Sequence, residues 1–465
     1  MAPEIRDQLR RAARGPRADL DPAALRRRVR QLRRRRLGSA VAAVALLALL
    51  LPVGRAGLER LREPVNVVDR PVAREPVPAT ATTRPAVPAA PRRTPQEVLR
   101  ALSRLPPGWS DLPRPPAPRA RAVSLWIGTH LLFWGGDSGN AGTYHADGWL
   151  FDPVARHWHG IARSPLAGRS LAAAAWTGDT VLVWGGYARG SRFNDGASYD
   201  PVTNTWRPLP AAPLSARVPV ATVWTGTELI VWGSTARDGS DVRDGAAFSP
   251  QTNRWRTIAP APVGLNQAGW PPPSTVWTGQ EMVVVGSRLD DNNATTPPWS
   301  PYSSGLAYHP ATDTWRVLPT VRLSPQASTA VWTGSKVLAW DYDLRAAIYD
   351  PKQDAWRRLP DPPLEPCAAS PEGAATDRVV LAQGCGHALW DIQAGKWVTV
   401  EPKANRYYGH GRIVAAGPVF LIAGATHESN ANGLVAYNPA EPVPPAGPAQ
   451  ARTQVVDDVR DRQPA

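Results

Sequence analysis

Short apolar runs separated by turn residues recur along most of the chain. In the clearest example, Val181-Leu182-Val183-Trp184, four apolar residues in succession are followed by Gly185-Gly186. An apolar run of this length, bounded by turn residues, is typical of a strand buried on both faces. Just before it, Thr177-Gly178 supplies a glycine, which adopts the positive φ of a tight hairpin turn without steric cost. The segment therefore predicts two antiparallel strands joined at Thr177-Gly178.

A second hairpin follows each apolar run. Tyr199-Asp200-Pro201 stands a few residues before Trp206, with Val202-Thr203-Asn204-Thr205 between them. Proline pre-sets φ at a turn corner, and Asp and Asn side chains stabilise such turns. One unit of the chain therefore predicts four short strands.

This unit is repeated along the chain. The Trp-Thr-Gly sequence recurs at Trp176, Trp224, Trp277 and Trp332, a divergent copy starts near Trp126, and two degenerate copies end at Gly384 and Gly424. The tryptophan of the second hairpin recurs at Trp158, Trp206, Trp255, Trp315, Trp356 and, weakly, Trp397. Four short strands cannot bury their own faces, whereas a ring of such units can. We expect an all-β, seven-bladed propeller over residues 106–440; six blades, the alternative, leave one apolar hairpin unexplained.

The repeat resembles the kelch motif. Gly-Gly closes the second strand, Tyr-Asp-Pro follows, and a tryptophan stands about six residues later, as in Tyr199-Asp200-Pro201 and Trp206. The resemblance implies a kelch-type propeller of the galactose oxidase-like group. It is clear in five copies and erodes in the last two, where Trp-Thr-Gly is missing.

The order of the repeats also predicts how the ring closes. The last copy runs through Tyr437-Asn438-Pro439 and stops without its tryptophan strand. The missing piece stands at the other end, because Trp109-Ser110-Asp111-Leu112-Pro113 matches Trp206-Arg207-Pro208-Leu209-Pro210. We therefore expect the N-terminal strand to complete the last blade.

The front of the chain predicts a membrane anchor. Leu37–Val53 is an uncharged apolar run at the short end of what spans a bilayer as a helix. Four arginines, Arg33 to Arg36, precede it, which predicts a cytoplasmic N-terminus and an extracellular propeller. The alternative is a cleaved signal peptide, but 36 residues precede the run and its exit lacks small residues in an A-x-A pattern.

The remaining segments flank the anchor and the propeller. Residues 1–36 form a basic cytoplasmic tail, and residues 54–105 are rich in Pro, Ala and Arg, which favours an extended stalk. This stalk ends in a capping box, Thr94 to Glu97, that opens a short helix. Residues 441–465 are expected to be a disordered tail.

The net charge of +14 does not indicate nucleic-acid binding. Residues 1–36 hold thirteen arginines and four acidic residues, so 9 of these 14 charges lie in the tail. The propeller is only mildly basic, and we expect no nucleic-acid partner.

The two cysteines are expected to form a disulfide. Cys367 and Cys385 lie outside the membrane in this topology, where disulfides persist. Both are equidistant from the expected hairpin turn near Thr376, so they would face each other across two strands.

Candidate binding residues lie on the loops between strands two and three and between blades, which share one face. The longest loop, Ser287 to Ser304, carries aromatic residues, and long loops in compact domains are usually functional or disordered. The residues that we single out on this face are Trp270, Trp299, Tyr302, His145, His427 and Tyr407.

We expect no cofactor and no metal. Asp238, Asp241 and Asp244 match no calcium-loop motif. His145, His427, Tyr407 and Tyr408 resemble the copper ligands of galactose oxidase in type, but that enzyme's motifs do not transfer residue by residue. The expected function is therefore non-enzymatic binding of a protein or a cell-envelope glycan. The alternative is an extracytoplasmic enzyme, either an oxidase or one that acts on glycans.

Overall fold

The computed structural model describes residues 87–138, 142–234, 242–265, 273–286, 288–289, 304–323, 328–341, 343–364, 372–384, 386–401, 412–425 and 432–439. All of them belong to one compact unit, Thr83–Ala465. The predicted transmembrane helix lies outside these residues. Within the part that is described, no helix is long and apolar enough to cross a membrane.

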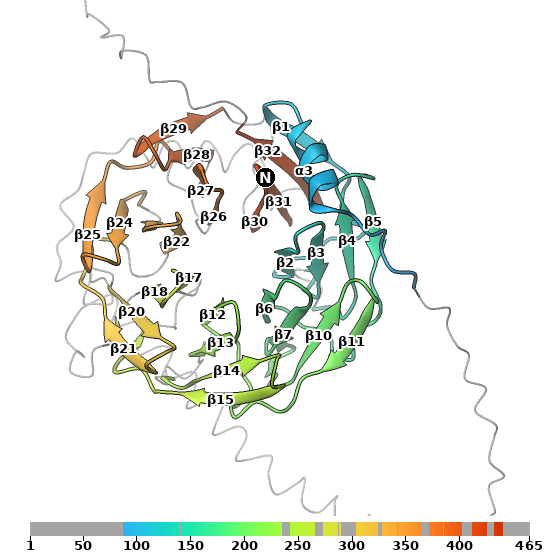
Figure 1. Cartoon of the computed structure of the whole chain (residues 1–465), viewed down its shortest axis with the longest axis horizontal. Helices are drawn as coiled ribbons and strands as arrows, with labels where there is room; N and C mark the ends of the chain where they lie inside the picture. Colours follow the sequence, from blue (N-terminus) through green and yellow to red (C-terminus); the bar gives the residue numbers. More distant parts are fainter. Residues whose placement is uncertain are drawn as a thin grey trace, which may run out of the picture. The chain divides into compact units, whose positions relative to one another are not determined.

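The described residues form seven four-stranded antiparallel sheets, arranged as blades around a central axis (Figure 1). Blade 1 contains β2 (Val123–Trp126), β3 (Leu131–Trp134), β4 (Gly148–Asp152) and β5 (His157–Gly160). Blade 2 contains β6 (Ala173–Trp176), β7 (Val181–Trp184), β10 (Gly196–Asp200) and β11 (Thr205–Pro208). Blade 3 contains β12 (Ala221–Trp224), β13 (Leu229–Trp232), β14 (Gly245–Ser249) and β15 (Arg254–Ile258).

The other four blades repeat this order. Blade 4 contains β17 (Ser274–Trp277), β18 (Met282–Gly286), β20 (Ser304–His309) and β21 (Thr314–Val317). Blade 5 contains β22 (Ser328–Trp332), β23 (Val337–Asp341), β24 (Ala346–Asp350) and β25 (Ala355–Leu359). Blade 6 contains β26 (Glu372–Ala375), β27 (Val379–Gly384), β28 (Gly386–Asp391) and β29 (Lys396–Val400). Blade 7 contains β30 (Arg412–Ala416), β31 (Val419–Ala425), β32 (Asn432–Asn438) and β1 (Gly108–Leu112).

The remaining elements are short. They are α3 (Pro95–Ser103), β8 (Tyr187–Ala188), β9 (Ser191–Arg192), β16 (Gly264–Leu265) and β19 (Arg288–Leu289). The capping box predicted for the helix is present, since Thr94 Oγ1 accepts from Glu97 N and the Glu97 carboxylate accepts from Thr94 N. The seven four-stranded sheets confirm the predicted seven-bladed fold, and the six-bladed alternative is wrong.

The second strand of each blade is the most deeply buried. All four residues of β7 are buried, as are all four of β13. Strands of this kind lie between two neighbouring strands of their own sheet and between the faces of two neighbouring blades. Their continuous apolar sequence follows from that position.

Tryptophans of the fourth strands fill the wedge between blades. Trp206 packs against Tyr199 of its own blade and against Trp134 of blade 1, with ring centroids 5.6 Å apart in the second contact. Its indole Nε1–H donates to Ala162 O, which follows the last strand of blade 1, at 2.9 Å. Equivalent bonds to the preceding blade are donated by Trp158, Trp255, Trp315, Trp397 and Trp109.

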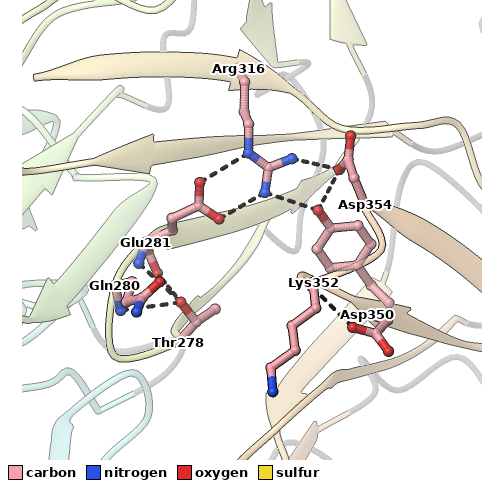
Figure 2. A network of polar contacts seen from close by, with 8 residues as sticks. Thr278, Gln280, Glu281, Arg316, Asp350, Lys352 and Asp354 are labelled. Carbon is pink, nitrogen blue, oxygen red and sulfur yellow. Dashed lines mark hydrogen bonds and ion pairs between the residues drawn. The ribbon is translucent and has the colours of Figure 1, made fainter. Parts of the chain in front are cut away.

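Polar side chains add a second contact between blades 4 and 5. Figure 2 shows Arg316 of β21 between Glu281, at the first turn of blade 4, and Asp354, at the second turn of blade 5. Arg316 donates to both Glu281 oxygens, at 2.9 and 2.7 Å, and to Tyr349 OH at 2.9 Å. Hydrogen bonds to Glu281 raise the pKa of Arg316, and burial raises the pKa of Tyr349. The guanidinium therefore stays charged and the phenol stays protonated.

The ring closes as the sequence predicts. β1 pairs with β32, with Trp109 opposite Tyr437 and Leu112 opposite Leu434. Blade 7 is therefore built from both ends of the described chain. Trp109 takes the place that Trp206 has in blade 2, and its indole donates to Glu401 O of blade 6 at 2.9 Å.

Part of the segment expected to be a stalk lies on the propeller. We call residues 87–105 the N-terminal strap. Its carbonyls at Val87 and Pro88 accept from Asn204 of blade 2, and Arg93 binds Asp152 of blade 1. Val98 and Leu102 of α3 are buried in a core cluster with residues of blades 7 and 1. The strap therefore crosses the turns of blade 2, blade 1 and blade 7 in succession.

The closure contact can be tested with a matched pair of variants. Trp109→Phe removes the hydrogen bond to Glu401 O, whereas Trp356→Phe removes the same ring volume at a position whose indole has no acceptor among the described residues. We expect Trp109→Phe to cost about 1 kcal/mol more free energy of unfolding, measured with urea. Equal losses would mean that the indole bond of the closing strand contributes nothing.

The contact between blades 6 and 7 beside Trp109 also predicts that the free energy of unfolding depends on pH. The ring of His387 lies 4.7 Å from that of Trp109, and burial lowers the pKa of His387 to about 4. Between pH 6.5 and 4 the unfolded chain binds a proton that the folded chain does not, so stability falls as the pH falls. The loss is about 3 kcal/mol at most.

We expect His387→Phe to reduce the dependence of unfolding free energy on pH in this window by about half, because burial also lowers the pKa of His130 to about 4. The control is His157→Phe, at an exposed position, which should keep the wild-type slope. A His387→Phe slope that matches the wild type would show that this histidine is not the group responsible.

Candidate functional site

Each blade presents two kinds of loop on opposite faces. We call the side with the loops between strands two and three and between blades the top face, and the side with the two hairpin turns the turn face. The top face carries the candidate binding residues, and its loops in blades 1, 2 and 3 share a common construction.

A buried tryptophan anchors the far end of each of these three loops. Trp134, Trp184 and Trp232 end the second strands and are fully buried. Their indoles donate to the backbone carbonyls of Ala146, Asn194 and Arg243, at 3.2, 3.1 and 2.9 Å. Each acceptor lies just before the third strand, so the loop is fastened where it returns to the blade.

A buried arginine fastens each loop a second time. Arg119, Arg169 and Arg217, from the segments that precede blades 1, 2 and 3, have side chains that are at most 2% exposed. Each forms two hydrogen bonds with a carboxylate, that of Asp147, Asp195 or Asp244 respectively. We call these contacts the Arg–Asp pins. Because the arginines are buried while the carboxylates are more than half exposed, the pins present acidic groups on the top face.

Aromatic rings complete two of the pins. The guanidinium of Arg119 lies 4.2 Å from the centre of the Trp149 ring, and that of Arg169 lies 3.9 Å from the Phe193 ring. A cation over an aromatic face is attracted by the ring quadrupole. The Arg–Asp pins of blades 1 and 2 therefore combine a charged pair with an aromatic ring.

Backbone hydrogen bonds join neighbouring loops across the top face. Arg169 N donates to His145 O at 3.1 Å, and Gly136 N donates to Arg169 O at 2.8 Å. This close approach requires glycine, since a Cβ at Gly135 would lie 2.8 Å from Arg169 O and one at Gly136 would lie 2.7 Å from Ala120 O. The Gly-Gly pair therefore lets the segment that leads to one blade lie against the blade before it.

His145 is the predicted binding residue that the structure describes. It lies on the top loop of blade 1, where Nε2 is 2.7 Å from Ser138 Oγ and Nδ1 is 3.9 Å from Asp147 Oδ1. Burial and the Arg119 charge lower the pKa of His145, so the ring is neutral at pH 7. Burial raises the pKa of Asp147, but the hydrogen bonds from Arg119 lower it by more, so the net shift of the pKa is downward.

This group has the residue types of a catalytic triad but not its geometry. A separation of 3.9 Å between Nδ1 and the carboxylate is too long for a hydrogen bond. Asp147 is instead held by Arg119, so it does not orient the imidazole as a triad carboxylate does. The arrangement fits hydrogen bonding to a ligand better than nucleophilic catalysis.

The other candidates lie outside the described residues. They are Trp270, Trp299, Tyr302, His427 and Tyr407, together with Cys367 and Cys385 of the expected disulfide. Of the acidic loop of blade 3, Asp244 is described and belongs to an Arg–Asp pin. In the described ranges, no three His, Cys, Asp or Glu side chains are grouped so that they could hold a metal ion.

The comparison with family models agrees with the repeat construction. Residues 121–339, from the start of blade 1 to the second strand of blade 5, match a family model described as "KLHDC2/KLHL20/DRC7 Kelch-repeats domain". Residues 121–339 therefore carry kelch repeats, and they form part of the seven-bladed β-propeller. A solved structure titled "Structure of YjhT" is 16% identical, with a TM-score of 0.43, over 71% of this chain and 96% of that chain. No curated protein matches the chain.

Kelch propellers commonly serve as protein-interaction modules.

The arginines of the Arg–Asp pins are top-face residues that were not predicted from the sequence, although their positions follow a recurring sequence pattern. Arg119, Arg169 and Arg217 each stand four positions before a first strand, and each partner aspartate directly precedes the glycine that opens a third strand. This recurrence distinguishes them from ordinary surface residues.

The Arg–Asp pins predict that removing the carboxylate destabilises the fold more than removing the arginine does. Asp195→Ala leaves the charge of Arg169 buried without its carboxylate, whereas Arg169→Met leaves an aspartate that is 54% exposed and accessible to water. We expect Asp195→Ala to be the more destabilising by about 1–3 kcal/mol in urea unfolding. Equal costs, or the reverse order, would contradict the view that the buried charge dominates the pin.

Proposed function

We propose that the chain is a membrane-anchored, extracellular kelch propeller that binds a protein or a cell-envelope glycan through its top face and performs no catalysis. The observation that carries this proposal is the construction of the top face in blades 1, 2 and 3. Tryptophan anchors and Arg–Asp pins fix the residues at which those loops return to their blades, so groups held there lose little conformational entropy when a ligand binds.

The exposed chemistry of this face supports recognition. Asp147, Asp195 and Asp244 each expose a carboxylate on the top face of blades 1, 2 and 3. In blade 1 the neutral His145 ring lies 2.7 Å from the Ser138 hydroxyl and 3.9 Å from the Asp147 carboxylate. Tyr144 and Tyr187, with ring centroids 5.9 Å apart, add partly exposed aromatic surface between blades 1 and 2. Aromatic side chains that also hydrogen-bond are the groups that most often dominate binding energy.

The membrane location rests on the sequence. The apolar run Leu37–Val53 and the arginines before it support an anchor whose N-terminus is cytoplasmic. Under this topology the propeller meets partners outside the cell. The enzymatic alternative has less support, because the one Ser-His-Asp group on the described top face lacks triad geometry.

The proposal is tested by capture of a ligand on intact cells with the full chain as bait. We expect Tyr144→Ala with His145→Ala to reduce capture at least about tenfold, since each side chain contributes about 1 kcal/mol or more at a contact. The matched control is Lys352→Ala, an exposed position on the turn face of blade 5, which should capture normally.

A second arm locates the ligand among the loops. Trp299→Ala with Tyr302→Ala should also lose ligand, with an unchanged melting temperature, if the long loop of blade 4 takes part. Normal capture by both double variants, with melting temperatures unchanged, would place recognition elsewhere and refute the top-face site.

A further inference from the structure

The turn face carries an apolar surface that the proposed ligand site does not use. Within the described ranges, the large hydrophobic side chains that remain exposed are Val87, Leu99, Val154 and Val202, at 45%, 43%, 37% and 50% exposure. Val87 and Leu99 belong to the N-terminal strap. Val154 and Val202 occupy the same position in the second turns of blades 1 and 2. All four therefore lie along the path of the strap.

Contacts of the strap bring these side chains onto one surface. Asn204, in the turn that contains Val202, donates to Val87 O at 2.8 Å. Asp152, which accepts from Val154 N at 2.8 Å, is bound by Arg93 of the strap. Further along, Leu99 lies against the first turn of blade 7, where a Cβ on Gly417 would be 2.5 Å from Leu99 Cδ2.

Arginines surround the apolar side chains. Arg104 and Arg156 line a cleft of about 220 Å³ together with Leu102, Leu105 and Val154. Arg100 stands four residues before Arg104 on the same side of α3, and Arg92 is exposed on the strap. We call Val87, Leu99, Val154 and Val202, with Arg92, Arg100, Arg104 and Arg156, the strap patch.

Several acidic groups of this surface are committed to local contacts. Glu97 caps α3 through Thr94, Asp152 is fully buried against Arg93, and Asp200 accepts from Val202 N and Thr203 N. Arg156 donates to a backbone carbonyl, that of Asp111, so its charge is not neutralised by that bond. Backbone hydrogen bonds leave Glu97 and Asp200 ionised as well, but the four exposed arginines outnumber them, so the strap patch has exposed apolar side chains within a rim of net positive charge.

We propose that the strap patch docks the propeller onto an anionic lipid surface. Apolar side chains set among arginines are the composition of surfaces that enter a membrane interface and attract acidic headgroups. The strap is also where the described chain begins, downstream of the apolar run Leu37–Val53. The proposal rests on the membrane location given under "Proposed function".

Docking in this manner orients the molecule. The strap patch lies on the turn face, so the top face with its Arg–Asp pins points away from the bilayer and stays open to ligands. Each arginine near an anionic surface raises the partition coefficient from water to the membrane about fivefold. Three arginines together therefore raise this coefficient about a hundredfold.

The experiment compares the full chain in vesicles of phosphatidylcholine alone and with phosphatidylglycerol added. Hydrogen exchange is measured by mass spectrometry for peptides that cover residues 95–105 and 152–156. We expect slower exchange in both peptides only where phosphatidylglycerol is present. Arg100→Gln with Arg104→Gln and Arg156→Gln should abolish this protection. The control, Arg254→Gln with Arg357→Gln and Arg378→Gln, removes the same charge from exposed sites on blades 3, 5 and 6 and should retain it.

The outcomes separate docking from anchoring. Resistance to alkaline carbonate extraction reports on the anchor alone, and its loss would refute the membrane location without deciding the exchange result. Equal exchange in the two lipids, or protection that survives the triple change with melting temperature unaltered, would overturn lipid docking. Protection that appears only when a second protein is added would assign the strap patch to a protein partner and would also overturn it.

Discussion

The propeller depends on one contact that is repeated between blades: an indole of the fourth strand that bonds back to the blade before it. Trp206 shows its elements, since the ring packs on Tyr199 and Trp134 while Nε1–H donates to Ala162 O. The gap between blades widens away from the axis, and a ring of this size fills it where a smaller side chain would leave a cavity. Loss of such a ring costs about 3–5 kcal/mol. Because the tryptophan of each blade packs against the blade before it, an open ring would leave one tryptophan without a neighbouring blade to pack on.

That constraint explains why the closure could be predicted from the sequence. Trp109, like Trp206, is followed by Leu and Pro three and four positions later. A fourth strand of this kind must pair with a third strand that has no fourth strand of its own. The only such strand is the one that ends at Asn438, and β1 pairs with it. Repetition made the number of blades, the buried second strands and the two hairpin turns equally predictable. In each case the same physical requirement recurs in every copy, so one unclear copy does not obscure it.

The top face was less predictable because its contacts join residues of common surface types. Arg119 and Asp147 are 28 positions apart, and nothing about either alone indicates that the arginine is buried and the carboxylate is not. The strap was missed for a similar reason. Its Pro- and Ala-rich composition favours an extended chain, which is correct locally, but the carbonyls of Val87 and Pro88 and the charge of Arg93 find partners on blades 1 and 2. The positions of Trp270, Trp299 and Tyr302 follow from no repeat, so their part in binding stays a prediction.

The loops of the top face differ according to whether the buried tryptophan of the second strand finds a backbone acceptor for its indole N–H. Trp134, Trp184 and Trp232 each bind a carbonyl at the end of a loop, and an arginine pins the next residue. In blade 5 the chain returns within residues 342–345, and the equivalent Trp340 finds no acceptor for its indole among the residues described. Instead its ring lies over Gly373 of blade 6, where a Cβ would approach Trp340 Cζ2 to 2.7 Å. The same side chain thus anchors a loop where the loop is long and seals a blade interface where it is short. In blades 1, 2 and 3 the anchoring contacts are made by buried side chains at the blade end of the loop, so the fastening does not depend on the exposed residues between them.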